Sequence, residues 1–232
     1  MAEGHIIAMG GCAVGEPESD PLVDFALGLA RRQPPRVLWL GTAGNEDPWF
    51  TLNFYDAMAG RVVDVRRVEL FPWPPDDLRE RVLESDVIWV SGGNTANALA
   101  LWRVHGVHEL LREAWEAGAV LCGPSAGGIC WFEASVTDSF GPQLEGMHDG
   151  LGFLAGSMCP HYDGEERRRP VYTELVRGGF PAGYAADDGV GLHFAGTELA
   201  EAVTCREGAR AYRVELVDGE VVETPLDTRL LG

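Results

Sequence analysis

The sequence predicts an α/β fold built on a doubly wound, mostly parallel sheet, with antiparallel hairpins in its C-terminal region. Short apolar runs alternate with segments whose apolar residues recur at helical spacing, which is typical of strands joined by crossover helices. The apolar run at 5–11 ends in glycines and suits a central strand buried on both faces. The last forty residues change to strand pairs around tight turns, with Asp218-Gly219 as the clearest turn signal.

The first half of the chain is predicted to supply the parallel strands and the helices between them. The expected strands lie at 5–11, 36–41, 62–70, 86–90 and 119–122. The expected helices lie at 21–32, 49–59, 76–84, 95–102, 107–117 and 125–132. In the first of these helices, Leu22, Phe25 and Leu29 recur at helical spacing and would form its buried face.

The pattern is weaker after residue 132. Residues 133–152 are rich in Gly, Ser and Asp, and they predict irregular structure or a short hairpin. A strand is expected at 157–162, where it stops at a histidine, and a helix from 165 to about 177. Segments 184–189 and 190–194 follow, and they are expected to form a strand, a turn and a second strand. No internal repeat or low-complexity tract is found.

Length and charge limit the classes of protein that this chain can belong to. At 232 residues it is long enough for one large α/β domain, and with no linker in sight a single domain over 1–232 is expected. The formal net charge is −18, which disfavours binding to nucleic acid or to anionic membranes. We find neither a secretory leader nor an apolar run of membrane-spanning length, so a cytoplasmic location is expected.

The reactive side chains narrow the chemistry further. The chain has no lysine, which removes Schiff-base chemistry, lysine general bases and Ser-Lys dyads. Its five cysteines include no C-x-x-C pair, and they predict reduced thiols rather than a disulfide framework or a zinc site. No metal and no cofactor are expected. The cysteines are Cys12, Cys122, Cys130, Cys159 and Cys205.

Ser125 is the candidate nucleophile. The strand at 119–122 runs into Gly123-Pro124-Ser125-Ala126-Gly127 and then a helix, which is the pattern of a nucleophile elbow. Small neighbours allow the sharp bend, and the unpaired amides at the start of the helix can hold a developing oxyanion. A glycine-rich turn that only packs, or that cradles a phosphate, is the alternative. A Walker-type loop is excluded because no Gly-Lys-Ser/Thr occurs.

A serine nucleophile in a chain without lysine needs a histidine as its base. His161 is favoured, because it ends a strand where the catalytic edge of the sheet is expected. The other histidines are placed at the far end of a strand, in helices, in the loose segment or on an alternating strand. They are His5, His105, His108, His148 and His193.

The base in turn needs an acid to orient it. Asp187 and Asp188 precede a glycine at a strand-turn-strand corner, where a carboxylate can point at a ring nitrogen. Asp138, near the elbow helix, is the runner-up. An Asp-Asp-Gly that serves only as a turn is the other interpretation.

A second glycine turn follows the fourth strand, at Ser91-Gly92-Gly93-Asn94-Thr95. Asn94 or Thr95 is placed to cap the next helix. The turn could also direct a backbone N–H from Gly92 or Gly93 into the site, or it could be a simple connection.

Taken in order, the motifs V-S-G-G-N-T, G-P-S-A-G-G, P-H-Y and A-D-D-G resemble those of the peptidase E family of serine peptidases. Aspartyl dipeptidases belong to that family and cyanophycinases are related to it. The resemblance spans nearly the whole chain. It implies the flavodoxin-like sheet of class I glutamine amidotransferases, which carry a cysteine at the elbow.

The resemblance also implies roles for individual residues. Ser125 would be the nucleophile, His161 the base and Asp188 the orienting acid, while the backbone amides of Gly93 and Ala126 would form the oxyanion hole. The chain order Ser, His, Asp differs from that of α/β-hydrolases, which argues against a lipase or esterase.

The expected function is a serine exopeptidase that cleaves short peptides after an N-terminal aspartate. Asn94 and the arginines Arg167, Arg168 and Arg169 are the expected substrate contacts, because a bidentate arginine can hold an aspartate side chain. The segment between His161 and these arginines is shorter than in the aspartyl dipeptidase. A cyanophycinase-like or carboxypeptidase-like hydrolase, and a non-catalytic protein that binds a small anion, are the alternatives. Self-association is left open.

Overall fold

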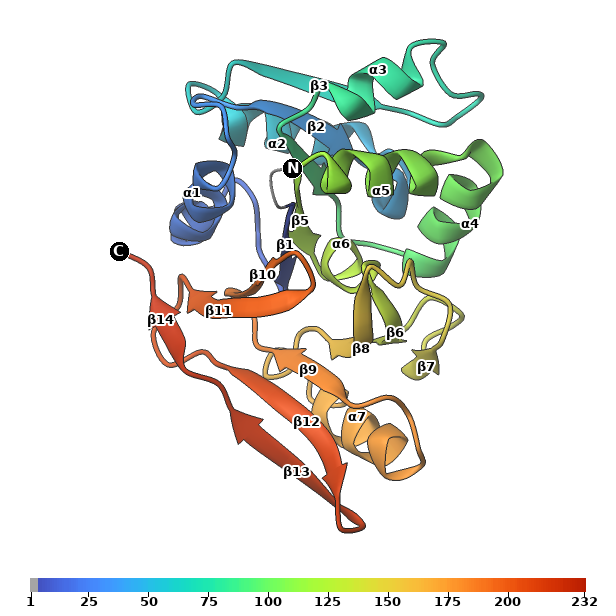
Figure 1. The fold of residues 1–232 in the computed structure, drawn as a ribbon, viewed down its shortest axis with the longest axis vertical. Helices are drawn as coiled ribbons and strands as arrows, with labels where there is room; N and C mark the ends of the chain where they lie inside the picture. The colour runs from blue at the N-terminus through green and yellow to red at the C-terminus, as the bar shows by residue number, and fades with distance from the viewer. Residues whose placement is uncertain (1–3) are drawn as a thin grey trace.

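The parallel strands that the sequence predicts form the centre of the larger of two β-sheets (Figure 1). The computed structural model describes residues 4–232. In the larger sheet the strand order is β14-β11-β10-β1-β5-β4-β2-β3. The neighbours from β1 to β3 pair in parallel. These central strands are β1 (His5–Met9), β2 (Arg36–Leu40), β3 (Asp64–Val68), β4 (Val87–Val90) and β5 (Val120–Pro124).

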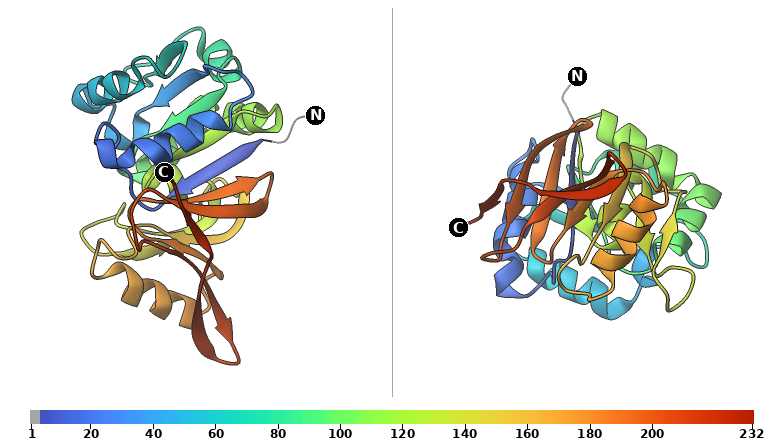
Figure 2. Two further views of the ribbon diagram at one scale, coloured as in Figure 1. Left: turned by 90° about the vertical axis from the view of Figure 1, so that its left-hand side faces the viewer. Right: turned by 90° about the horizontal axis from the view of Figure 1, so that it is seen from below.

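Helices cover both faces of this sheet (Figure 2). Alternate strand residues point to opposite faces. Ile6 and Ala8 accordingly belong to one hydrophobic cluster and Ile7 and Met9 to the other. On one face lie α3 (Leu78–Leu83), α4 (Thr95–His105) and α5 (Val107–Glu116); on the other lie α1 (Asp20–Gly28) and α2 (Pro48–Met58). Two short 3₁₀ turns, η1 (Pro17–Ser19) and η2 (Thr42–Gly44), follow β1 and β2.

Antiparallel strands extend the larger sheet beyond β1. β10 (Val190–Ala195) pairs antiparallel with β1 and with β11 (Glu198–Thr204), and β14 (Thr228–Leu230) lies parallel to β11 at the edge. The doubly wound α/β prediction is therefore confirmed.

A second sheet, in the lower part of Figure 1, is an addition to the prediction. Its order is β13-β12-β9-β8-β6-β7, and it mixes parallel and antiparallel pairs. α7 (Arg168–Arg177) packs against it. Its strands are β6 (Phe132–Thr137), β7 (Glu145–Met147), β8 (Leu154–Cys159), β9 (Gly183–Ala186), β12 (Ala211–Val217) and β13 (Glu220–Pro225).

Two predicted boundaries after Ser125 are wrong. The helix expected at 125–132 is only α6 (Ala126–Ile129), and Phe132 already begins β6. Glycines at 127 and 128 are poor helix formers, so tertiary packing rather than propensity sets the length of α6. The strand expected at 157–162 ends at Cys159, so His161 lies just beyond β8. The short hairpin expected within 133–152 is present as the antiparallel pair β6–β7.

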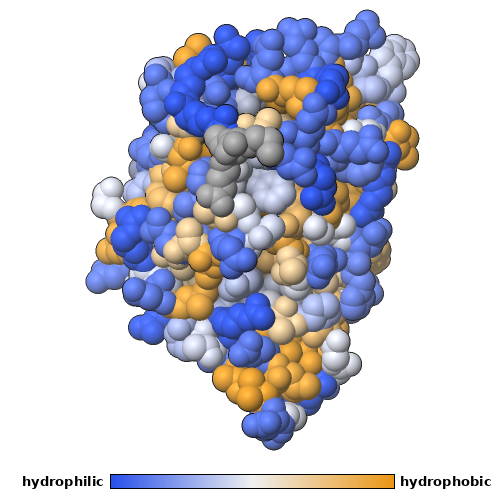
Figure 3. Space-filling view, viewed as in Figure 1, coloured by the Kyte–Doolittle hydropathy of each residue, from blue (hydrophilic) through white to orange (hydrophobic). Residues whose placement is uncertain are grey.

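The hairpin β12–β13 closes through the predicted turn. Asp218 and Gly219 have φ of 53° and 86°, the two left-handed residues that a type I′ turn requires. Leu216, Val217 and Val222 are exposed on this hairpin, and Figure 3 shows hydrophobic residues gathered there. Within residues 4–232, no helix has the length and apolar character to cross a bilayer.

Candidate active site

Ser125 stands at a sharp bend between β5 and α6. Its backbone is in an unusual conformation, with φ 53° and ψ −113°. The bend is held from both sides, because the Ser125 amide donates to the Met9 carbonyl at 3.1 Å and its own carbonyl accepts from Gly128 and Ile129. Such a conformation costs about 1–3 kcal/mol and persists only where the surroundings impose it. The half-buried hydroxyl is therefore presented by a rigid turn.

The glycines of the elbow allow close packing on the neighbouring backbone. A Cβ on Gly127 would lie 2.3 Å from the carbonyl oxygen of Val90 at the end of β4. No side chain fits there, so α6 rests directly on the strand ends.

His161 and Asp188 form a hydrogen-bonded pair. Nδ1 of His161 lies 2.6 Å from Oδ1 of Asp188, and the His161 side chain is 22% exposed. The hydrogen bond from His161 holds the pKa of Asp188 below its ordinary value, against the opposing effect of burial. His161 also has a positive φ, 52°, so both Ser125 and His161 are held in strained backbone conformations.

Asp188 is fixed at the corner where the chain passes from the smaller sheet to the larger one. Its amide donates to Oδ1 of Asp163 at 2.9 Å, and its carbonyl accepts from Nε of Arg206 at 3.0 Å. The carboxylate sits against Gly11, where a Cβ would come within 2.0 Å of Oδ1. These contacts orient the acid toward His161.

The two alternative acids lie elsewhere. Asp187 is buried, and its carboxylate accepts from the Arg210 amide at 2.9 Å; burial raises its pKa. Asp138 is exposed beyond the end of β6. Among residues 4–232, only Asp188 hydrogen-bonds to the imidazole of His161.

Two cavities meet at His161. One, of about 520 Å³, is lined by Ser125, His161, Gly92 and Gly93, together with aromatic residues of β2, α2 and β4. The other, of about 610 Å³, is lined by His161, Asp188 and the 205–207 loop. Within the described residues, no hydrogen bond joins Ser125 Oγ to the imidazole, and the amides of Gly93 and Ala126 have no protein acceptor. Unpaired N–H groups are what an oxyanion hole requires; Gly93 lines the 520 Å³ cavity, whereas Ala126 is buried directly after Ser125 in the chain.

The expected substrate contacts are not brought to this site. The Oδ1 of Asn94 caps α4 by accepting from the Asn97 amide at 2.9 Å, and its Nδ2 donates to the Ser139 carbonyl at 2.8 Å. Asn94 therefore holds the loop after β6 to the start of α4.

The three arginines also line neither cavity. Arg168 is buried and donates to Glu165 and to the Val136 carbonyl. Arg169 forms an ion pair with Glu223 of β13, with Nη2 2.6 Å from Oε2. Arg167 is exposed just before α7.

Comparison with known proteins places the chain in a family. The profile of peptidase family S51 matches residues 6–202. The chain belongs to peptidase family S51. It is 46% identical over 230 residues to the uncharacterized peptidase YgaJ of Bacillus subtilis (strain 168), which covers 98% of this chain and 99% of that protein. As a member of S51, the chain is a serine-type peptidase, and the predicted resemblance to peptidase E is confirmed.

Solved structures support the S51 fold at lower sequence identity. The crystal structure of a peptidase from an acI-B1 Actinobacterium aligns with a TM-score of 0.73 at 15% identity, covering 97% of this chain and 95% of that one. A candidate peptidase E protein of Listeria monocytogenes EGD-e aligns with a TM-score of 0.57 at 16% identity, covering 97% and 100%. The predicted class I glutamine amidotransferase-like fold is likewise confirmed.

Two residues of the candidate site were missed by the sequence analysis. Arg206 and Asp163 form an ion pair that braces the backbone of Asp188. Asp163 follows His161 by two residues, and a carboxylate so close to the base was an available signal. Arg206 follows β11, and nothing in its local pattern indicates that it returns to the site.

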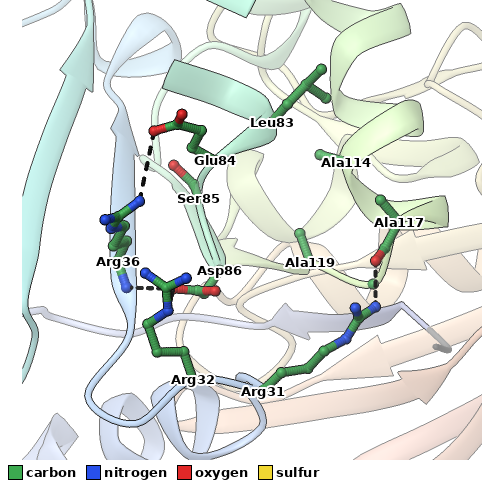
Figure 4. A pocket seen from close by; sticks show the side chains of 11 residues that line it. Arg31, Arg32, Arg36, Leu83, Glu84, Ser85, Asp86, Ala114, Ala117 and Ala119 are labelled. Atoms are coloured by element: carbon green, nitrogen blue, oxygen red, sulfur yellow. Dashed lines mark hydrogen bonds and ion pairs between the residues drawn. The ribbon is translucent and has the colours of Figure 1, made fainter. Parts of the chain in front are cut away.

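A further cavity, of about 290 Å³, lies away from the S51 site at the opposite end of the strands (Figure 4). Its arginines are engaged. Arg31 donates to the Ala117 carbonyl. Nε of Arg32 lies 3.8 Å from Oδ2 of Asp86, and Nη1 of Arg36 lies 3.7 Å from Oε2 of Glu84. None of its lining residues is a predicted site residue.

Proposed function

We propose that this S51 peptidase hydrolyses short peptides through an acyl-enzyme on Ser125, with His161 as general base and Asp188 as the acid that orients it. The observation that carries the proposal is the 2.6 Å hydrogen bond between His161 and Asp188, beside a cavity that His161 shares with Ser125. A strained serine at a strand-to-helix elbow supports the same assignment.

The geometry suggests a role for each group. Because Nδ1 of His161 is bound to Asp188, Nε2 is left to take the proton of Ser125 Oγ as the oxygen attacks the scissile carbonyl. The amides of Gly93 and Ala126 would bind the oxyanion. Protonated His161 then donates its proton to the leaving amine. In the second half of the reaction, neutral His161 takes a proton from the attacking water and returns it to Ser125 Oγ as the acyl-enzyme is hydrolysed.

The size of the site favours small substrates. The cavities on the two sides of His161 measure about 520 and 610 Å³, each within the usual range for a small ligand. Arg206, which lines the second cavity, retains guanidinium N–H groups beyond its bonds to Asp163 and Asp188. It is placed to hold the free carboxylate of a short peptide. Cleavage after aspartate stays a prediction, and its expected arginine contacts are engaged elsewhere.

A probe and a substrate panel test the proposal. A fluorophosphonate should label the wild-type protein but not Ser125→Ala. Hydrolysis of short peptides by Ser125→Ala should fall by roughly a million-fold, as in other serine triads. Asp188→Asn should lose roughly 10⁴-fold in kcat because the histidine tautomer is no longer fixed. Asp187→Asn, the matched neighbour, should lose less than tenfold. Equal labelling of wild type and Ser125→Ala would contradict the proposal.

A further inference from the structure

We propose that the cavity beside Ser125 holds the side chain on the acyl side of the scissile bond, and that it selects a bulky aromatic or aliphatic residue over an acidic one. This inference rests on the proposed function, since it takes Ser125 as the nucleophile. It goes further by naming the class of substrate, and it differs from the aspartate predicted from the sequence.

The position of the nucleophile decides which cavity takes the acyl side. The acyl carbon becomes bonded to Ser125 Oγ, and its oxygen faces the amides of Gly93 and Ala126. Only the 520 Å³ cavity is lined by both Ser125 and Gly93. The leaving amine must instead lie within reach of His161, which lines both cavities together with Cys12 and Ala13. The residue before the scissile bond therefore enters the 520 Å³ cavity, and the residue after it faces the other.

Aromatic rings make up the floor of the acyl-side cavity. Trp39 and Phe54 stack with their centroids 4.3 Å apart, and Phe54 lies 5.7 Å from Trp89. Trp39 is 6% exposed and Phe54 and Trp89 at most 1%, so these rings back the cavity and offer it little surface of their own. Phe50, 52% exposed, stands among the lining residues on α2. A ring or branched chain placed here gains apolar burial without requiring a new hydrogen bond.

This floor is rigid before any ligand binds. Trp39 lies on β2, and its indole N–H donates to Thr51 Oγ1 of α2 at 3.2 Å. The bond ties the strand to the helix that carries Phe50 and Phe54. A preformed apolar site loses little ordering entropy when a side chain enters.

The charges around the cavity disfavour aspartate. Among the described residues that line it, Glu16 carries the one carboxylate, and no arginine lines it. A substrate carboxylate would leave water without gaining a cationic partner, and it would face a like charge. The Ser91 hydroxyl accepts from the Gly44 amide at 3.1 Å, and its own O–H is a neutral donor rather than a cationic partner.

The experiment measures kcat/KM for Phe-Ala, Leu-Ala and Asp-Ala with the full-length protein. Wild type should hydrolyse Phe-Ala and Leu-Ala at least tenfold better than Asp-Ala. Phe50→Ala should lower kcat/KM for Phe-Ala by about tenfold, mainly through KM, because it removes part of a pocket wall. Leu52→Ala changes an exposed residue of the same helix that does not line the cavity, and it should have little effect.

Glu16→Gln tests the charge argument separately. It should raise kcat/KM for Asp-Ala severalfold and leave that for Phe-Ala within twofold. Glu109→Gln, which changes an exposed residue of α5 that lines neither cavity, should leave both values unchanged. Wild-type preference for Asp-Ala, or equal effects of Phe50→Ala and Leu52→Ala, would overturn the inference and leave the serine mechanism intact. Inertness toward every substrate, with no fluorophosphonate labelling, would overturn the proposed function and this subsite together.

Discussion

Asp187 and Asp188 are adjacent in the chain, yet their carboxylates meet opposite surroundings. Asp188 accepts a hydrogen bond from His161, which lowers its pKa. Asp187 points into the protein toward the Arg210 amide, where burial raises its pKa. Consecutive residues of an extended corner face opposite ways, so one supports the base and the other the packing.

The two pKa shifts predict opposite pH dependences of stability. The folded-state pKa of Asp188 is lowered, so its contribution is present above the ordinary value of 3.8 and is lost as the pH falls through the folded-state pKa. For Asp187 the contribution is full below 3.8 and declines as the pH rises through its raised pKa. Thermal unfolding between pH 2.5 and 7 should therefore show that the stability lost through Asp188→Asn is largest at the upper end of this pH range. Relative to wild type, Asp187→Asn should gain stability with rising pH. Parallel curves for the two variants would contradict this.

Local motifs predicted Ser125, His161 and the Asp187-Asp188 corner, and the resemblance to peptidase E then selected Asp188 over Asp187. The arginines expected to contact substrate, Arg167, Arg168 and Arg169, line neither cavity beside His161, and the geometry of the chain gives the reason. Successive residues around a helix start point in different directions, so three consecutive arginines cannot converge on one ligand. Arg168 turns inward to the Val136 carbonyl, and Arg169 reaches Glu223 instead.

At the level of elements, the turn that carries Gly93 is held by the cap of α4. Asn94 is the N-cap, and it also holds the loop after β6 through Ser139. One side chain thus couples a helix start, a segment of the smaller sheet and the glycine turn beside the candidate oxyanion hole.

Removing this cap should destabilise the protein measurably. Asn94→Ala should lower the free energy of unfolding by about 1 kcal/mol, the usual cost of losing an N-cap, plus the loss of the Ser139 bond. Asn94→Asp retains a capping oxygen and should recover most of the first contribution. Urea unfolding measures both, with Asn97→Ala, an exposed residue of the same helix, as the control. Identical stabilities of Asn94→Ala and Asn97→Ala would show that the cap contributes nothing.

The elements that the sequence predicted best are those with strong local patterns. The five parallel strands lie within a few residues of their expected places. Four of them are largely apolar runs, whereas β3 reads Asp-Val-Arg-Arg-Val. The pairing missed most clearly is that of β6 with β8. Phe132 pairs with Leu154 and Ala134 with Ser157, and a register set across twenty residues leaves no local signal.

Across the whole molecule, one hydrophobic cluster joins the two sheets. It contains Ile6 and Leu121 of the larger sheet together with Phe132, Met158 and Ala186 from β6, β8 and β9. The second sheet was not predicted because its strands come from distant segments, but its packing follows from these shared contacts.

A shared core predicts cooperative unfolding. If residues 1–232 form a single domain, heating should give one calorimetric transition whose enthalpy equals the van't Hoff value. Far-UV circular dichroism and tryptophan fluorescence should change together. Two separate transitions, or probes with different midpoints, would show that the smaller sheet unfolds by itself.

The candidate catalytic groups come from both sheets. Ser125 follows β5 of the larger sheet, whereas His161 follows β8 and Asp188 follows β9 of the smaller one. A shift of one sheet against the other by an ångström or two would separate the nucleophile from its base while every strand stayed paired. The hydrolytic rate would then depend on how the two sheets are aligned. Hydrolytic activity would be lost well before any spectroscopic sign of unfolding.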